Sequence, residues 1–312
     1  MQPPPTTLSP PTRTPGPPVG YPPYPLPAAP VPQGRPRRST PWYAWVLGSF
    51  LGFLAIGGLV LAVLFGLVAA GVIGVLIAPE VSQTRTHVFK MSGTPSLTVQ
   101  NTTGTIQVLP GADGQITVQV TKRARDVSTS AAQNDLDAMT ITMTQNANTL
   151  SIDARTNVTG LIKQLKADLV LTVPAAANLH LDEVAGTITV SGTTGTFSTH
   201  LTTGTIEVHN VTLTGNAQLS TITGNLTFDG VLTNGASLTA TVTTGTASLT
   251  LPAETSAHLD ARVNVGAISI SGWPITVQRQ VTGASAAGDL TPNPSGMLTV
   301  QVTTGDIHLT AR

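Results

Sequence analysis

Side chains that could carry chemistry are few and scattered in this chain of 312 residues. There is no cysteine, which excludes disulfides, thiolate nucleophiles and cysteine-ligated zinc. The sequence contains no H-E-x-x-H, no G-x-S-x-G and no phosphate-binding or dinucleotide fingerprint. The histidines are His87, His180, His200, His209, His258 and His308. Two of them, His200 and His209, would meet only on adjacent strands, and we expect solvent-facing positions instead.

One adjacent pair of carboxylates, Asp182 and Glu183, has the residue types of a general acid and a general base. Because successive side chains of a strand point to opposite faces, the two would not share a site. A glycosidase pair could be assembled from neighbouring strands instead, but an aromatic-lined groove would be expected with it. Two of the three tryptophans lie near residue 45, far from such a groove in sequence. We therefore expect no enzyme and neither a metal nor a cofactor site.

Charged residues make up only 10% of the chain and are unevenly distributed. Residues 1–41 carry arginines and no acids, whereas the chain from Glu80 onward holds 11 basic and 15 acidic residues. A mildly acidic region has no basic stripe to neutralise phosphates, which argues against nucleic acid as a partner.

Residues 1–41 hold 16 of the 24 prolines. Such a segment cannot bury enough apolar surface to fold, and proline favours an extended polyproline II conformation. The composition predicts a disordered cytoplasmic tail. Two interpretations remain open: a docking peptide for an aromatic-lined groove, or a solvated spacer.

Residues 42–78 contain no charged side chain. Because a bilayer crossing needs about 20 apolar residues, the segment predicts one transmembrane helix that is tilted or protrudes from the lipid. A hairpin hinged at Gly57–Gly58 is the alternative. The apolar run is much longer than that of a signal peptide, although the small residues 69–71 offer a cleavage site.

Basic and aromatic residues at the start of the span predict its orientation. Arg35, Arg37 and Arg38 precede it, and Trp42 and Trp45 mark the same interface. The positive-inside rule places this end in the cytoplasm. We therefore expect a single-pass protein of the cell membrane whose C-terminal domain lies outside.

A G-x-x-x-G motif, Gly48 and Gly52, lies within the span. Small residues at this spacing allow two helices to approach closely, so the motif is a candidate face for self-association. The abundance of glycine in membrane spans is the alternative explanation.

After an expected linker at 79–94, residues 95–168 show short alternations typical of strands. These are 96–100, 105–109 and 115–121, followed by a hairpin of 140–144 and 149–155. Leu136 and Met139 lie between them at helical spacing and predict a short helix or a polar loop at 122–139.

Residues 169–312 repeat a short motif of the type T-T-G-T-I-x-V. Its turn glycines, with an early copy at Gly104, are Gly104, Gly186, Gly195, Gly204, Gly224, Gly245, Gly266 and Gly305. The central spacings are close to 20 residues, a period that indicates a solenoid, although a stack of small sheets remains possible. The alternating apolar residues would stack inward, among them Ile188/Val190, Ile206/Val208, Leu226/Phe228 and Ile268/Ile270. Threonine and serine would form outward ladders.

The series TGTIxV, TGNLTF, TTGTASLTLP and VGAISI, with the preceding LVLTVP at Leu169–Pro174, resembles the DUF4097 family, whose members are proposed adhesins. The resemblance covers residues 95–312. It implies a right-handed β-helix-like domain, often tethered to a bacterial membrane. Family turns are usually acidic, but only Asp306 remains here, so no cation site in the turns is expected.

The sequence thus predicts an all-β, repetitive solenoid behind one transmembrane helix and a disordered tail. The favoured function is a non-enzymatic surface protein that is adhesin-like or structural in the envelope. Its partners would be the lipid bilayer and surface polymers or other cell-surface proteins. The alternatives are an envelope-stress or signalling component whose tail binds a cytoplasmic partner, and an enzyme built on a β-helix.

Overall fold

The computed structural model describes residues 80–156 and 164–312. The predicted tail, the span and the candidate helix-association motif Gly48/Gly52 lie outside the described residues. So do the topology anchors Arg35, Arg37, Arg38, Trp42 and Trp45. Within the described part of the chain, no helix is long and apolar enough to cross a membrane.

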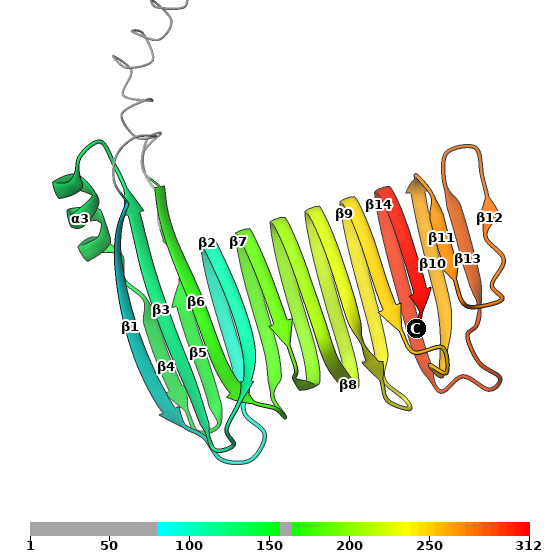
Figure 1. The fold of residues 1–312 in the computed structure, drawn as a ribbon, viewed down its shortest axis with the longest axis horizontal. Helices are drawn as coiled ribbons and strands as arrows, with labels where there is room; N and C mark the ends of the chain where they lie inside the picture. Colours follow the sequence, from blue (N-terminus) through cyan, green and yellow to red (C-terminus); the bar gives the residue numbers. More distant parts are fainter. Residues whose placement is uncertain (1–79, 157–163) are drawn as a thin grey trace, which may run out of the picture. The chain divides into compact units, whose positions relative to one another are not determined.

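The described residues form one sheet of fourteen strands and one short helix (Figure 1). The elements in chain order are β1 (Val81–Lys90), β2 (Ser96–Gly111), β3 (Gln115–Arg125), α3 (Thr129–Ala138), β4 (Thr142–Asn146), β5 (Thr149–Ala154), β6 (Gln164–Pro174), β7 (Asn178–Ser191), β8 (Thr194–Leu232), β9 (Ser237–Leu251), β10 (Ala257–Val265), β11 (Ile268–Ser271), β12 (Gln278–Arg279), β13 (Ala284–Asp289) and β14 (Gly296–Ala311). The chain is all-β, as predicted.

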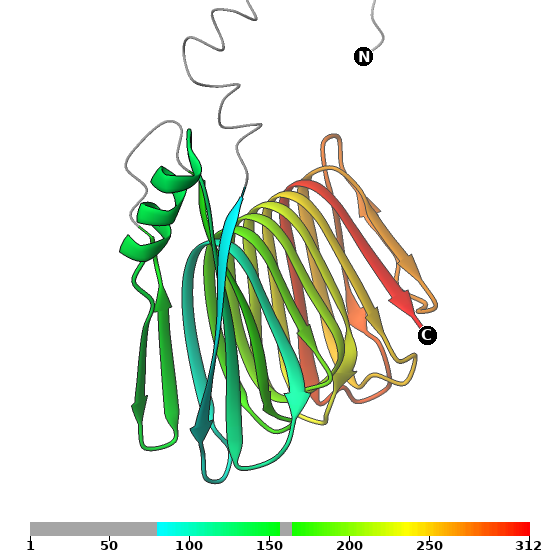
Figure 2. The same ribbon diagram turned by 60° about the vertical axis from the view of Figure 1, so that its left-hand side comes forward.

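Most of the sheet is a parallel coil, in which each turn of the chain, termed a rung, pairs with the next (Figure 2). A rung has two strand segments that meet at a glycine of the repeat. β8, with 39 residues, contains two rungs in one continuous strand. The separate strands predicted at 96–100 and 105–109 are likewise the two halves of β2. The glycine bends a strand whose hydrogen bonding continues, and does not end it.

The order of rungs in space differs from the order in sequence at the C-terminal end. β14 pairs in parallel with β9 on one side and with β10 and β11 on the other. The even spacing of Gly245 and Gly266 had implied consecutive rungs. Instead, the last strand of the chain returns and fills the position between them, so that Gly305 pairs with Gly245. The period of the repeat gives the number of residues in a rung, but it does not determine which rungs pair with each other.

Antiparallel strands cover both ends of the coil. At the N-terminal end β3 pairs with β6, β1 with β3, and β4 with β5. At the C-terminal end β13 pairs with β10, and β12 with β13. These strands occupy edges that would otherwise present unpaired backbone groups. β1 lies within 79–94, the segment expected to be a linker, so that expectation was wrong for residues 81–90.

A single apolar cluster runs through the inside of the coil. Ile106, Ile188 and Ile206 share one column, and the adjacent column holds valines of the same rungs. Each fully buried aliphatic side chain contributes about 1.5–3 kcal/mol, but only if the next rung covers it. The predicted inward residues are buried, except that Ile270 of the short strand β11 is only partly covered.

A column of glycines marks the bend of every rung. A Cβ on Gly224 would lie 1.7 Å from the carbonyl oxygen of Gly204, and Gly204 approaches Gly186 just as closely. Their φ angles, from +134° at Gly305 to +155° at Gly186, are also ones that L side chains rarely adopt. The column consists of Gly104, Gly186, Gly204, Gly224, Gly245, Gly305 and Gly266. Gly195, also predicted as a turn glycine, has φ +152° but packs against Ala177 at a different corner.

Of the two alternatives for residues 122–139, a short helix or a polar loop, the structure shows the helix, and the predicted hairpin is confirmed. α3 occupies part of 122–139, with Leu136 buried and Ser128 as its N-cap. β4 and β5 pair across a tight turn in which Ala147 has a φ of +50°.

Candidate functional site

The first segment of each rung presents an outward row of polar side chains, which we term the polar face. It is built by alternation, because Leu219 and Leu238 point into the core while Gln218 and Ser237 point out. Parallel pairing places like positions of neighbouring rungs in register, as with Gln218 and Thr239. The polar side chains therefore form ladders spaced by about 4.8 Å, the distance between paired strands.

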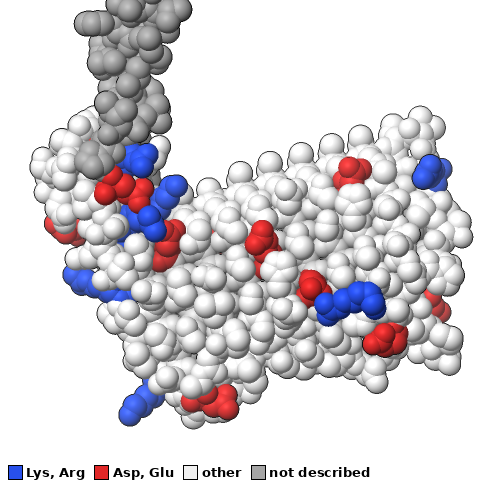
Figure 3. Space-filling model, viewed as in Figure 1, with Lys and Arg blue, Asp and Glu red and all other residues white. Residues whose placement is uncertain are grey.

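The centre of the polar face is uncharged. Residues 210–228 and 230–253 contain no charged side chain. The face of the coil that is in view in Figure 3 carries scattered acidic and basic side chains, several of them over the rungs. A shallow depression of about 400 Å³ lies at the centre of the polar face, and its polar lining is Ser198, Asn216, Gln218, Ser237 and Thr239. This surface matches a neutral, hydroxyl-rich ligand better than a charged one.

Part of this lining is fixed and part is free. The Oγ of Ser237 donates a 2.8 Å hydrogen bond to Oδ1 of Asn216. Within the described residues, the side chains of Ser198, Gln218 and Thr239 have no hydrogen-bond partner. Their amide and hydroxyl groups are therefore available to a ligand, as donors and acceptors.

A polar pair on β2 and β7 lies inside the coil, on the inward side of the strand segments whose outward side forms the polar face. Asn101 and Glu183 are each 2% exposed and are in register on β2 and β7. The Nδ2 of Asn101 donates to Oε1 of Glu183 at 2.8 Å and to the carbonyl of Ala167 at 3.0 Å. Oδ1 of Asn101 and Oε2 of Glu183 have no partner among the described residues.

Burial raises the pKa of the Glu183 carboxyl to about 8, and the nearby Asp168 acts in the same direction. The hydrogen bond from Asn101 opposes this shift without overcoming it. Near neutral pH the group is therefore mostly a neutral acid inside the core. The adjacent Asp182 points outward, so the two carboxyls lie on opposite faces of the strand and do not share a site, as the alternation of the strand predicted.

The histidines are dispersed. His180 lies 3.1 Å from Asp182, and His258 lies 2.5 Å from Asp289. His200 and His209 belong to opposite segments of one rung and pair in register with Asp182 and Ser191. Within residues 80–156 and 164–312, no group of three or more His, Asp or Glu side chains could hold a metal ion. Asp306 accepts a 2.9 Å hydrogen bond from the backbone of Ala267 instead.

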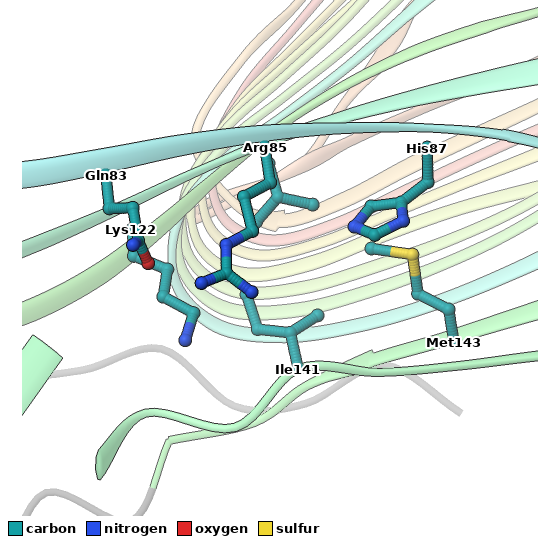
Figure 4. Close-up of a pocket in the computed structure, with 7 residues that line it drawn as sticks. Gln83, Arg85, His87, Lys122, Ile141 and Met143 are labelled. Carbon is teal, nitrogen blue, oxygen red and sulfur yellow. The ribbon is translucent and has the colours of Figure 1, made fainter. Parts of the chain in front are cut away.

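A second candidate site, termed the basic pocket, lies at the N-terminal end (Figure 4). Its cavity of about 170 Å³ lies between the face of β1 and β3 and the hairpin strand β4. Its lining residues are Gln83, Arg85, His87, Val120, Lys122, Ile141 and Met143. The first three alternate along β1 and so share one face, while Ile141 and Met143 face them from the other side of the cavity (Figure 4).

Positive charge is held partly out of water in this pocket. Burial lowers the pKa of the Lys122 ammonium, repulsion from Arg85 lowers it further, and Asp137 opposes both effects. Lys122 donates a hydrogen bond to the carbonyl of Met139. Among the described residues no carboxylate forms an ion pair with Arg85, His87 or Lys122.

Sequence reasoning missed the basic pocket, because it treated residues 79–94 as a linker. The signal was the alternation of Gln83, Arg85 and His87, which places three polar side chains on one strand face. No pattern in the sequence indicated that the hairpin strand β4 lies across the cavity from β1. Met143 of β4 and Ile141, which directly precedes β4, come more than 50 positions later.

The rung repeat, the glycine column and the capped coil coincide with a known family. The model of the Toastrack DUF4097 family matches residues 80–310. The chain belongs to the DUF4097 family. The family assignment made from the repeat is thus confirmed, and the match extends it toward the N-terminus to include β1.

Solved structures that are similar to this DUF4097 chain match it at low identity and with TM-scores below 0.5. A proposed cell adhesion protein from Clostridium sporogenes is 12% identical, with a TM-score of 0.36, covering 74% of this chain and all of its own. A proposed adhesin from Bacteroides fragilis is 13% identical, with a TM-score of 0.39, covering 75% and 99%. A proposed lipid binding protein from Parabacteroides distasonis is 12% identical, with a TM-score of 0.30, covering 74% and 95%. The comparison with curated proteins gave no match.

Proposed function

We propose that this DUF4097 chain is a non-enzymatic, membrane-anchored surface solenoid that adheres to neutral envelope or surface polymers through its polar face. The observation that carries the proposal is the uncharged centre of that face. There, a shallow depression of about 400 Å³ is lined in part by Ser198, Gln218 and Thr239, whose side chains have no hydrogen-bond partner among the described residues.

Polar ladders suit an extended polymer more than a small molecule. Small-molecule sites are usually concave and mostly apolar, whereas this surface is open and five of its seven lining residues carry an amide or a hydroxyl. A polymer that lies along the coil would meet a polar side chain at every rung, so weak contacts would add through multivalency. The rigid parallel coil holds these groups in place, which limits the entropy lost on binding.

Anchoring is the second part of the proposal. The uncharged segment 42–78, preceded by Arg35, Arg37 and Arg38, supports one crossing with the tail in the cytoplasm. The coil would then lie outside the cell. Protease treatment of intact cells tests this arrangement: a tag placed after Arg312 should be digested from outside, and digestion only after lysis would contradict it.

Adhesion can be tested with matched pairs of substitutions on the two outward faces of the same strands. Gln218→Ala with Thr239→Ala removes two partner-free groups from the polar face. Thr227→Ala with Ser248→Ala removes two groups in the same register relationship from the opposite face. Cells that display the full chain are allowed to adhere to an immobilised neutral polysaccharide under flow.

We expect the first pair to reduce adhesion by several-fold and the second to leave it unchanged. Adhesion equal to that of cells lacking the chain would contradict the proposal. So would an equal loss from both pairs, because it would indicate general destabilisation.

A further inference from the structure

We propose that the basic pocket binds the headgroup of an anionic phospholipid of the membrane in which the chain is anchored. The inference rests on the anchoring part of the proposed function and is independent of adhesion through the polar face. The pocket would then hold the first part of the coil against the bilayer surface.

The charge of the pocket favours an anion. Among the residues that the structure describes, its lining includes Arg85, Lys122 and His87 and no carboxylate. Within the described residues, the guanidinium of Arg85 has neither a hydrogen bond nor an ion pair, so its donors remain available. Arginine presents these donors in a planar fork that matches a phosphate oxygen pair, and lysine adds a point charge.

The other wall of the pocket is apolar. Ile141 and Met143 line the pocket opposite the charged side chains (Figure 4), and Val120, which is in register with Arg85, adds apolar surface on the wall of Arg85 and Lys122. A free phosphate ion would leave these groups facing water, whereas the glycerol and upper acyl carbons of a phospholipid would cover them. The combination of cations and apolar side chains in one cavity therefore favours an amphiphile over a simple anion.

The chain length between the predicted span and the pocket keeps the pocket near the lipid. Arg85 lies seven positions after residue 78, and even a fully extended chain of that length reaches at most about 25 Å. Glu80 is tied to the coil, because Arg123 donates a 2.9 Å hydrogen bond to its carboxylate and a 2.6 Å bond to Asp168. The start of β1 is thus fixed to β3 and β6.

Neutral polymers, the ligand proposed for the polar face, do not fit this pocket. Lys122 is already partly desolvated, and a neutral ligand would bury it and the exposed Arg85 further without neutralising either charge, which is unfavourable. An anionic headgroup removes that cost. The two sites therefore take different ligands.

The experiment uses the full chain in detergent micelles and native mass spectrometry, which counts bound lipids. The probes are phosphatidylglycerol, phosphatidylcholine of the same acyl length, and glycerol 3-phosphate without acyl chains. The test variant combines Arg85→Gln with Lys122→Gln, and Arg85→Gln alone is a milder second variant, because Arg85 is exposed. The charge-matched control combines Lys90→Gln with Arg262→Gln, which are exposed and lie outside the pocket.

We expect one phosphatidylglycerol adduct that phosphatidylcholine does not reproduce. Its affinity should fall at least tenfold in the double variant and remain in the control. Equal adducts of both lipids, or an adduct that survives Arg85→Gln with Lys122→Gln, would overturn the proposal. Glycerol 3-phosphate that binds as tightly as the lipid would also overturn it, because the ligand would then be a free phosphate.

Circular dichroism of each variant checks that the strands are retained. The adduct count does not depend on where the protein lies in the cell or on adhesion. A failed lipid site is therefore distinguishable from a failed topology, which the protease experiment tests, and from a failed polar face, which the adhesion experiment tests.

Discussion

The amide of Asn101 donates a hydrogen bond to the carboxyl of Glu183, 2.8 Å away on the next rung, with both side chains almost fully buried. Burial raises the pKa of Glu183 to about 8 from an ordinary value of 4.5. Below pH 4.5 both the folded and the unfolded chain hold this proton. Between about pH 4.5 and 8 only the folded chain holds it, so this contribution to stability is lost as pH rises through that window.

We therefore predict that the free energy of unfolding falls by up to about 1.4 kcal/mol per pH unit across this window because of Glu183. Glu183→Gln keeps an acceptor for Asn101 and removes the titration. The variant should be more stable than the wild type at pH 8.5, with the gap closing toward pH 4.5. Urea unfolding at a series of pH values measures this. Glu254→Gln, an exposed carboxylate, is the control, and parallel profiles for wild type and Glu183→Gln would contradict the prediction.

The glycine column yields a second prediction. In Gly224→Ala the new Cβ would lie 1.7 Å from the carbonyl oxygen of Gly204, so two rungs must separate locally in addition to the strain of a φ of +143°. We expect a loss of stability of about 3 kcal/mol or more.

Gly235→Ala separates strain from collision. Gly235 has a φ of +81°, but a Cβ there would meet nothing within 4 Å. Its substitution should cost only about 1 kcal/mol, since strain is the sole penalty. Thermal unfolding compares the two variants. If both cost the same, close packing of the column is not what requires glycine.

The sequence predicts those parts of this fold that depend on local pattern. Alternation places Ile188, Ile206 and Leu226 inside, and the recurring glycine locates the bend of each rung. The basic pocket could not be predicted, because Arg85 and Ile141 are far apart in sequence and no periodicity links them. The burial of Glu183 could be predicted only in part. The alternation of the strand places it on the opposite face from Asp182, but its hydrogen-bond partner Asn101 lies 82 residues away and could not be identified from the sequence.

The position of the last strand is the clearest case of information that periodicity lacks. Apolar rungs are interchangeable in composition, so a period near 20 residues does not say which rung follows which. The antiparallel cap β12–β13 pairs with β10, and this leaves the position between β9 and β10 for β14. The strands at the ends of the coil, and not the repeat, therefore determine which rungs are neighbours.

The position of β14 between β9 and the strands β10 and β11 can be tested with engineered disulfides, since the chain has no cysteine of its own. His308 of β14 is in register with Ser248 of β9 and with Ser269 of β11, and all three side chains lie on the outward face. Paired strands are about 4.8 Å apart, within the Cα separation that a disulfide spans, whereas strands two positions apart are about 9.6 Å from each other.

Ser248→Cys with His308→Cys should therefore cross-link under mild oxidation, as should Ser269→Cys with His308→Cys. Ser248→Cys with Ser269→Cys should not, because β14 lies between them. Mobility on a non-reducing gel and labelling with a maleimide report the bond. Efficient cross-linking of Ser248→Cys with Ser269→Cys would mean that rungs follow the order of the sequence and that the C-terminal strand covers the end of the coil instead of completing its interior.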